Sequence, residues 1–308
     1  MLQFYRAIWR HTAAQQISLI ALSVLVAALA AIPIDYQKRI INLLDDDISH
    51  EVLLWLGAEM LGVILLSLSL KWLLGYRTGT TGEGAIRFLR TLVVETADES
   101  TKGEVEIKRG TIANVISSET EAVGKFVGDS FAEPMLQFGT LVSVLGYIAF
   151  TLPNLAWVVI ILIAMQAAIV LAVQLRINQK VKERVIALRR SVNRITSEEL
   201  AAVKSEVEQD FDEIYEARRR VFLLKLSNKW ILSSLNAVGL VFVLMYGGWL
   251  VLEDRSDVGS VVAATIALGR MQGPWQRLIT YYRNLSAVFV QFELLRKLLV
   301  APGSANNA

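Results

Sequence analysis

The stretch from Leu73 to Phe88, LLGYRTGTTGEGAIRF, is rich in the residue type that lets a backbone wrap around a phosphate group. Its glycines are Gly75, Gly79, Gly82 and Gly84. A P-loop reads G-x-x-x-x-G-K-[ST], because its lysine must reach the terminal phosphates and its hydroxyl must bind magnesium. Gly79 and Gly84 have this spacing, but Ala85 and Ile86 follow them and can do neither. The G-x-G-x-x-G fingerprint of dinucleotide sites fails too, so the stretch does not predict nucleotide binding.

Helix packing explains these glycines better. The stretch directly follows an apolar run, Val52–Leu74, and no strand pattern precedes it. Gly75 and Gly79 are four residues apart, so on a helix they share one face and let a neighbouring backbone approach closely. We therefore expect a close helix contact at Gly75 and Gly79, where the chain leaves a membrane.

Ionisable side chains also fall within apolar stretches. Arg270 lies about twelve residues into the last stretch, roughly 18 Å deep. An ionisable group in hydrocarbon costs at least ~2.5 kcal/mol on insertion scales, so it usually faces a cavity or a partner. Arg270, Gln272 and Glu59 are therefore candidates for a polar pathway across the membrane. A structural pairing is the alternative for Arg270, with Gln272 and Gln276 beside it, and a structural hydrogen bond or an outer-mouth position for Glu59. We expect Lys71 to reach the membrane interface.

Other chemistry finds little support in the residue types. The chain has no cysteine, so it offers no thiolate nucleophile, no thiolate metal site and no disulfide. His11 and His50 fall in different segments, which argues against a metal centre. No cluster of catalytic residue types is visible, so we expect neither catalytic nor metal-ligating residues.

The composition is that of a membrane protein. Of the 308 residues, 54% are hydrophobic. Stretches of about 20 apolar residues match a hydrocarbon core of about 30 Å. The sequence has six: Ile17–Ile34, Val52–Leu74, Leu136–Leu152, Leu155–Leu175, Ile231–Leu252 and Val258–Tyr281. The third and sixth contain polar residues and are the weakest. The first is too long for a cleavable signal and lacks a small-residue cleavage site.

The Lys and Arg residues predict the orientation. They gather in the two long connections, after the second and fourth spans, whereas the other three loops together hold only Lys38, Arg39 and Arg255. By the positive-inside rule, both long connections and both termini face the cytoplasm. The outer loops are short, and Pro153 and Asn154 form nearly the whole of the second one.

Both long connections are patterned as helices. In the second, an apolar seam at helical spacing ends near Ile195. Capping boxes at Thr196–Glu199 and Ser205–Glu208 then predict a short helix over Ser197–Lys204 and a returning helix from about Glu206. In the first, we expect a polar break at residues 97–103, a brief strand-like alternation at residues 104–110, and a short helix within Gly110–Val127.

This plan resembles the transmembrane domain of ABC exporters over nearly the whole chain. That family carries a pattern close to G-x-L-x-x-R-L-x-x-D in its first intracellular loop. Gly110, Ile112, Ile116 and Glu119 stand at matching places, and Val115 replaces the arginine. Gly259 and Pro274 match positions after the fifth span. The second hairpin is shorter than usual and lacks the family's glycine.

The resemblance implies an all-α membrane protein with six transmembrane helices and long intracellular helical extensions. The domain would cover residues 1–299, with a short elbow at residues 1–16, and residues 300–308 would be a disordered tail. Two such units, identical or homologous, would enclose a cavity in a plasma membrane, most simply the bacterial inner membrane. The turns that would contact an ATPase contain Gly110, Thr111, Ile112, Ile116, Glu119, Ser197 and Glu199.

The resemblance further implies a transport function. Because no Walker A or signature sequence is visible before the end at VAPGSANNA, we expect ATP and magnesium to bind a separate ABC ATPase subunit. The chain itself would need no cofactor and contact no nucleic acid. An exporter-like scaffold with a binding or regulatory role and no ATP coupling is the alternative, and a fragment of a longer exporter is a third. The substrate is not encoded in any motif.

Overall fold

The chain divides into two units made of helices. The computed structural model describes residues 2–44, 49–101, 119–151, 153–197 and 200–299. Unit 1 combines Met1–Thr151 with Asp257–Ala308, and unit 2 is Leu152–Ser256. Within the described ranges every regular element is a helix and no strand occurs, which confirms the all-α prediction. The strand-like alternation at residues 104–110 lies outside these ranges.

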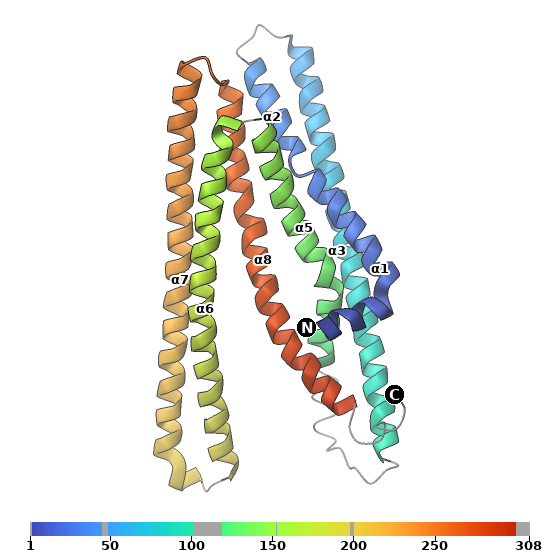
Figure 1. The fold of residues 1–308 in the computed structure, drawn as a ribbon. Helices are drawn as coiled ribbons and strands as arrows, with labels where there is room; N and C mark the ends of the chain where they lie inside the picture. Colours follow the sequence, from blue (N-terminus) through green and yellow to red (C-terminus); the bar gives the residue numbers. More distant parts are fainter. Residues whose placement is uncertain (1, 45–48, 102–118, 152, 198–199, 300–308) are drawn as a thin grey trace. The chain divides into compact units, whose positions relative to one another are not determined.

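Unit 1 is built around α5. Its helices are α1 (Leu2–Ala28), α2 (Ile32–Leu43), α3 (His50–Thr101), α5 (Thr120–Thr151) and α8 (Val258–Leu299) (Figure 1). The central helix, α5, contacts α1, α3 and α8, while α2 contacts α3 and α8. The third predicted span, one of the two weakest, is therefore the one that most of unit 1 packs against.

The first turns of the chain form an arm that crosses α5 and α8. At Thr12 the backbone leaves the helical region (φ −130°, ψ 18°), so the chain bends there. Phe4 and Ile8, before the bend, are buried among side chains of α5 and α8. The Phe4 ring lies 5.8 Å from that of Phe126 and 4.7 Å from that of Phe292. Aromatic packing thus fixes the start of the chain against both helices.

The glycine-rich stretch is continuous helix, because α3 runs through residues 73–88 without interruption. Our expectation about which glycines make close contact was wrong: an added Cβ at Gly75 or Gly79 would have no neighbour within 4 Å. The contact lies at Gly82, whose position faces the backbone of Gly124 and Lys125 on α5. Gly124 itself meets Ile86.

Gly128 lies one turn further along α5, and the close contact with α3 requires glycine there. A Cβ there would lie 2.3 Å from the carbonyl oxygen of Thr78. Gly124 and Gly128 are four residues apart, so α5 presents a small-residue face to α3. The backbone approach predicted for α3 is therefore real, but glycines of α5 permit most of it.

The first predicted span is broken in the middle. Its helix, α1, ends at Ala28, and α2 begins at Ile32 with Pro33 in its first turn. Pro33 has no N–H, and the N–H of Ile34 donates to Ala31 O (2.9 Å). The carbonyl of Ala30 is consequently left without a helical donor. Proline is tolerated in the first turn of a helix, but it cannot continue a helix that precedes it because it has no N–H.

Unit 2 is a hairpin of two long antiparallel helices, α6 (Pro153–Ser197) and α7 (Leu200–Leu252). At Gly239 an added Cβ would lie 2.5 Å from a methyl carbon of Leu162, so glycine permits close packing there. Near the other end, Arg190 pairs with the buried carboxylate of Asp210 (3.1 Å). These contacts join the two helices at opposite ends of the hairpin.

Two helix breaks were predicted wrongly. The separate short helix over Ser197–Lys204 does not exist, because α7 begins at Leu200 and continues past Glu206. Its first residues, Leu-Ala-Ala-Val-Lys, are mostly good helix formers, which outweighs the capping box at Ser205. Likewise, α3 continues to Thr101, through most of the predicted polar break, and Thr120–Val127 belong to the long α5.

Five helical segments of the described chain are long and apolar enough to span a membrane. They correspond to the first five predicted spans. The sixth predicted span forms the first half of α8, but Arg270, Gln272 and Gln276 lower its hydropathy. Large apolar side chains lie exposed along the spans, such as Trp55 (72%) and Phe150 (90%), as expected of surfaces that face lipid.

Candidate functional site

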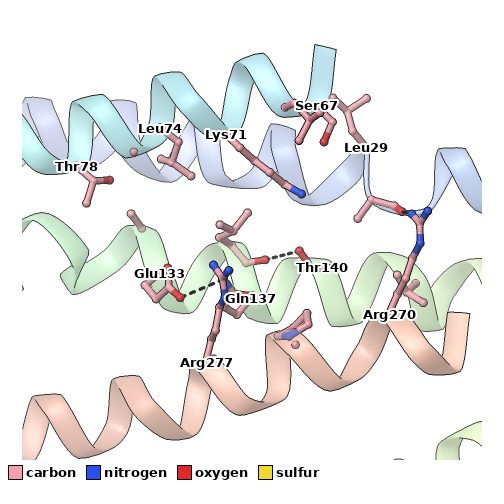
Figure 2. A pocket seen from close by; sticks show the side chains of 18 of the residues that line it. Leu29, Ser67, Lys71, Leu74, Thr78, Glu133, Gln137, Thr140, Arg270 and Arg277 are labelled. Atoms are coloured by element: carbon pink, nitrogen blue, oxygen red, sulfur yellow. Dashed lines mark hydrogen bonds between the residues drawn. The ribbon is translucent and has the colours of Figure 1, made fainter. Parts of the chain in front are cut away.

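Unit 1 contains a cavity of about 720 Å³ between the α1–α2 junction, α3, α5 and α8. A second cavity of about 480 Å³ continues between α5 and α8. The two share Asp129, Glu133, Gly273 and Arg277 as lining residues, and we call them together the polar groove. Figure 2 shows the larger cavity with charged side chains entering from α3, α5 and α8.

Arg270 lines the groove and caps the break in the first span. Its Nη1 donates to the free carbonyl oxygen of Ala30 at 3.4 Å (Figure 2). Leu29, Ala30 and Pro33 line the same cavity. Arg270 therefore faces the cavity and also satisfies a backbone group, while its role in a pathway stays a prediction.

Two further cations line the groove. Lys71 enters from α3 and Arg277 from α8 (Figure 2). Lys71 was expected to reach the membrane interface, yet it is a cavity residue here. Arg277 lies seven residues beyond Arg270, so two helical turns, about 10 Å, separate them along α8. Neither has an ion pair within 4.0 Å among the residues that the structure describes.

The acidic side of the groove lies on α5. Asp129, Glu133 and Gln137 follow one another at four-residue spacing and line the larger cavity. Gln137 Nε2 donates to Glu133 Oε1 at 3.1 Å. The sequence interpretation missed Asp129 and Glu133 because it began the third span at Leu136, and it did not single out Gln137 within that span. Their helical spacing was the available signal, since it places them on one face.

The other two pathway candidates lie elsewhere. Gln272 lines neither cavity of the polar groove. Glu59 is exposed on α3, near Tyr36 of α2. The groove thus unites Arg270 with residues that sequence reasoning left out, and it excludes Gln272 and Glu59.

Most of the coupling candidates fall outside the described ranges. These are Gly110, Thr111, Ile112, Ile116 and Glu199. Ser197 is the last residue of α6. Glu119 directly precedes α5, and its Oε2 is buried without a hydrogen-bond partner in the described part of the chain. Burial raises the pKa of Glu119 above its usual range.

The beginning of α8 is fixed to the end of α2 by a polar cluster. Asp257 Oδ1 accepts hydrogen bonds from Asn42 Nδ2 (2.8 Å) and from the N–H of Ser260 (2.7 Å). The N–H of Gly259 donates to Asn42 Oδ1 at 2.7 Å. A Cβ on Gly259 would lie 2.3 Å from that oxygen, so the position requires glycine. Asp257 thereby caps α8 and joins it to α2.

The charge of Asp257 is stabilised by these contacts. Burial by itself raises the pKa of Asp257. Hydrogen bonds from Ser260 and Asn42, together with Lys38 at 3.6 Å, lower it by more. The net pKa lies below the usual range, so the carboxylate is ionised near neutral pH.

Comparison with known families assigns the chain. The family described as the ABC transporter transmembrane region matches residues 17–275. This match runs from α1 into α8, past Arg270, and includes most of both units; no ATPase domain is matched. No curated protein matches the sequence at a significant level. Within the described ranges, no three His, Asp or Glu side chains group in a way that could hold a metal ion.

Proposed function

Because this chain belongs to the ABC transporter transmembrane region family, we propose that it is the membrane subunit of an exporter and that a separate protein hydrolyses ATP for it. The observation that carries the proposal is the polar groove. It is a cavity with five ionisable residues, from α3, α5 and α8, in a unit whose outer surface suits lipid. Charged groups inside membrane domains usually mark the route of a polar solute.

The helix through residues 73–88 supports the assignment of ATP to a partner. In continuous helix, the N–H groups from Gly75 to Gly84 are directed along the helix axis toward preceding carbonyls. They are therefore not free to surround a phosphate group. ATP and magnesium would accordingly bind to an ABC ATPase subunit.

The lengths of the helices supply a route for coupling. With 45 and 53 residues, α6 and α7 extend over about 68 Å and 80 Å. A hydrocarbon core is about 30 Å thick, so each helix projects several turns beyond it. Ser197 ends α6, and Glu119 directly precedes α5. An ATPase would contact these two helix ends and the sequence-predicted loop that contains Gly110.

The arrangement in the cell follows from the same reasoning. The chain would lie in a plasma membrane with both termini in the cytoplasm, since the long connections hold most of its cations. It would pair with a second copy or a homologous six-span subunit, and the two would enclose the pathway.

Crosslinking in native membranes tests the ATPase partner. A photo-crosslinking residue at Thr111 should capture an ABC ATPase, whereas one at Arg255, in a connection predicted to face outward, should not. The substitution Ile112→Asp should abolish ATPase stimulation in the purified complex, because it places a charge in the expected contact. Capture of no ATPase from Thr111, with unchanged activity of Ile112→Asp, would favour the scaffold without ATP coupling.

A further inference from the structure

Two cations of the polar groove, Lys71 and Arg270, have no ion pair among the residues that the structure describes. Both line the larger cavity and not the second one. Arg277, Asp129 and Glu133 line both cavities. The larger cavity is therefore lined by three cations and two acids, and two of the cations belong to it alone.

Lys71 and Arg270 cost free energy when the cavity holds no ligand. Arg270 makes one long hydrogen bond to a neutral carbonyl, and Lys71 has no ion pair among the described residues. A membrane-embedded cation is normally matched by an acidic group or by water. A ligand that brought an anionic group to Lys71 and Arg270 would supply the missing charge through charge-assisted hydrogen bonds.

The walls around these cations suit an apolar body joined to that anionic group. Leu29, Ile64, Leu68 and Val144 line the same cavity, and Ser67 and Thr140 offer hydroxyl groups between them. A volume of about 720 Å³ is in the range of pockets that hold small organic molecules. A hydrated inorganic anion would leave most of this apolar wall without contact.

We propose that the polar groove binds an anionic amphiphile, with its acidic group between Lys71 and Arg270 and its apolar part along the α3–α5 wall. This inference rests on the proposed function, because it names the class of solute that the pathway accepts. The acids of α5, which line the same cavity, then disfavour a second anionic group beside them.

Site-specific protection measures this binding without ATP or a partner. The chain has no cysteine, so Ser67→Cys gives a single reactive thiol inside the groove. The full chain with this substitution is placed in nanodiscs of phosphatidylcholine, and its alkylation rate is measured against added probe. The probes are dodecyl phosphate, dodecyltrimethylammonium, dodecyl maltoside and inorganic phosphate.

Dodecyl phosphate should protect the thiol at a concentration about tenfold lower than the cationic or neutral dodecyl probe, as the gain of a charge-assisted hydrogen bond implies. Inorganic phosphate should not protect. Adding Lys71→Gln should raise the half-protecting concentration of dodecyl phosphate about tenfold, and Lys71→Arg should not. Arg255→Gln, an exposed cation outside the groove, is the matched control.

Three outcomes would overturn the proposal. Equal protection by all dodecyl probes would show that charge is not recognised, and equal protection by inorganic phosphate would show that the apolar wall is not used. An unchanged response of Lys71→Gln would place the site elsewhere. Because Lys71 is exposed and no hydrogen bond or ion pair of it is seen in the described part of the chain, this variant is informative even where Arg270→Gln fails to fold. Capture of an ATPase from Thr111 tests the proposed function separately, so failure of either claim leaves the other intact.

Discussion

The hydroxyl of Tyr281 donates a hydrogen bond to the carbonyl oxygen of Ser130 at 2.5 Å. Ser130 lies four residues before Pro134, which has no N–H to offer this carbonyl within α5. Tyr281 on α8 therefore replaces the backbone donor that the proline removes. Because its only proton is used in this way, Tyr281 accepts from Tyr5 in their 2.7 Å contact. The arm at the start of the chain is joined to the same carbonyl through Tyr281.

Tyr281→Phe should lower the free energy of unfolding by about 1–2 kcal/mol, since a partly buried carbonyl loses its donor. The ring itself would stay packed on Phe126. In a Pro134→Ala background the loss should be smaller, because the new alanine N–H can bond to Ser130 within the helix. A double-mutant cycle from denaturant titrations in mixed micelles measures this coupling. An equal loss of unfolding free energy in both backgrounds would show that Tyr281 does not replace the backbone donor that Pro134 removes.

Gly128→Ala should destabilise the protein by about 1–3 kcal/mol, as overpacking of a tight contact does. Its new methyl group would meet the backbone of Thr78, which cannot move without shifting α3. Gly84→Ala on α3 is the control, because a Cβ at Gly84 would meet no atom within 4 Å among the described residues and alanine favours helix. Thermal unfolding followed by size exclusion compares the two variants. A Gly128→Ala variant as stable as Gly84→Ala would show that the α3–α5 contact is looser than described.

Asp257 should make the stability of unit 1 depend on acid pH. Its native pKa is lowered, so ionised Asp257 contributes stability above the ordinary carboxyl pKa of about 3.9. This contribution is lost as the pH falls through that value toward the lower native one. Thermal unfolding between about pH 5 and pH 3 should decline more steeply for the natural protein than for Asp257→Asn. Parallel curves for the two would mean that the contacts of Asp257 do not depend on its charge.

Cysteine labelling should establish the orientation, since no native cysteine interferes. A cysteine at Ser49 or Ser256 should react with an impermeant maleimide in intact cells. A cysteine at Ser205, exposed near the start of α7, should react only after permeabilisation. Reaction of the Ser205 variant in sealed cells would reverse or refute the six-span topology. Denatured samples provide the control for reactivity of each site.

The sequence predicts the large features of this fold because apolar length and helical period are local. The charge-free run of α6, the turn at Pro153 and the continuity of α3 from the membrane into polar sequence all follow from neighbouring residues. Arg270 could be predicted to face a cavity for the same reason, because an arginine within an apolar stretch rarely faces lipid.

Features that depend on partners far along the chain were not predictable. Gly82 contacts α5 because Gly124 and Gly128 face it, whereas a Cβ on Gly75 or Gly79 would meet no atom within 4 Å in the described part of the chain. The break after Ala28 is an exception, because Pro33 is a local signal for it that the apolar composition around it outweighed in the sequence analysis. The acids of the groove were missed because the boundary of the third span was set by hydropathy, although α5 begins well before that boundary.

The three polar contacts of α8 bear on how this helix is able to move. Asp257, Arg270 and Tyr281 each meet a fixed backbone or side-chain group on α2, the α1–α2 junction or α5. Sliding α8 by one turn, about 5.4 Å, would break all three contacts at once. We therefore expect a change of access in unit 1 to keep the register of α8 and to move α2, α5 and α8 together.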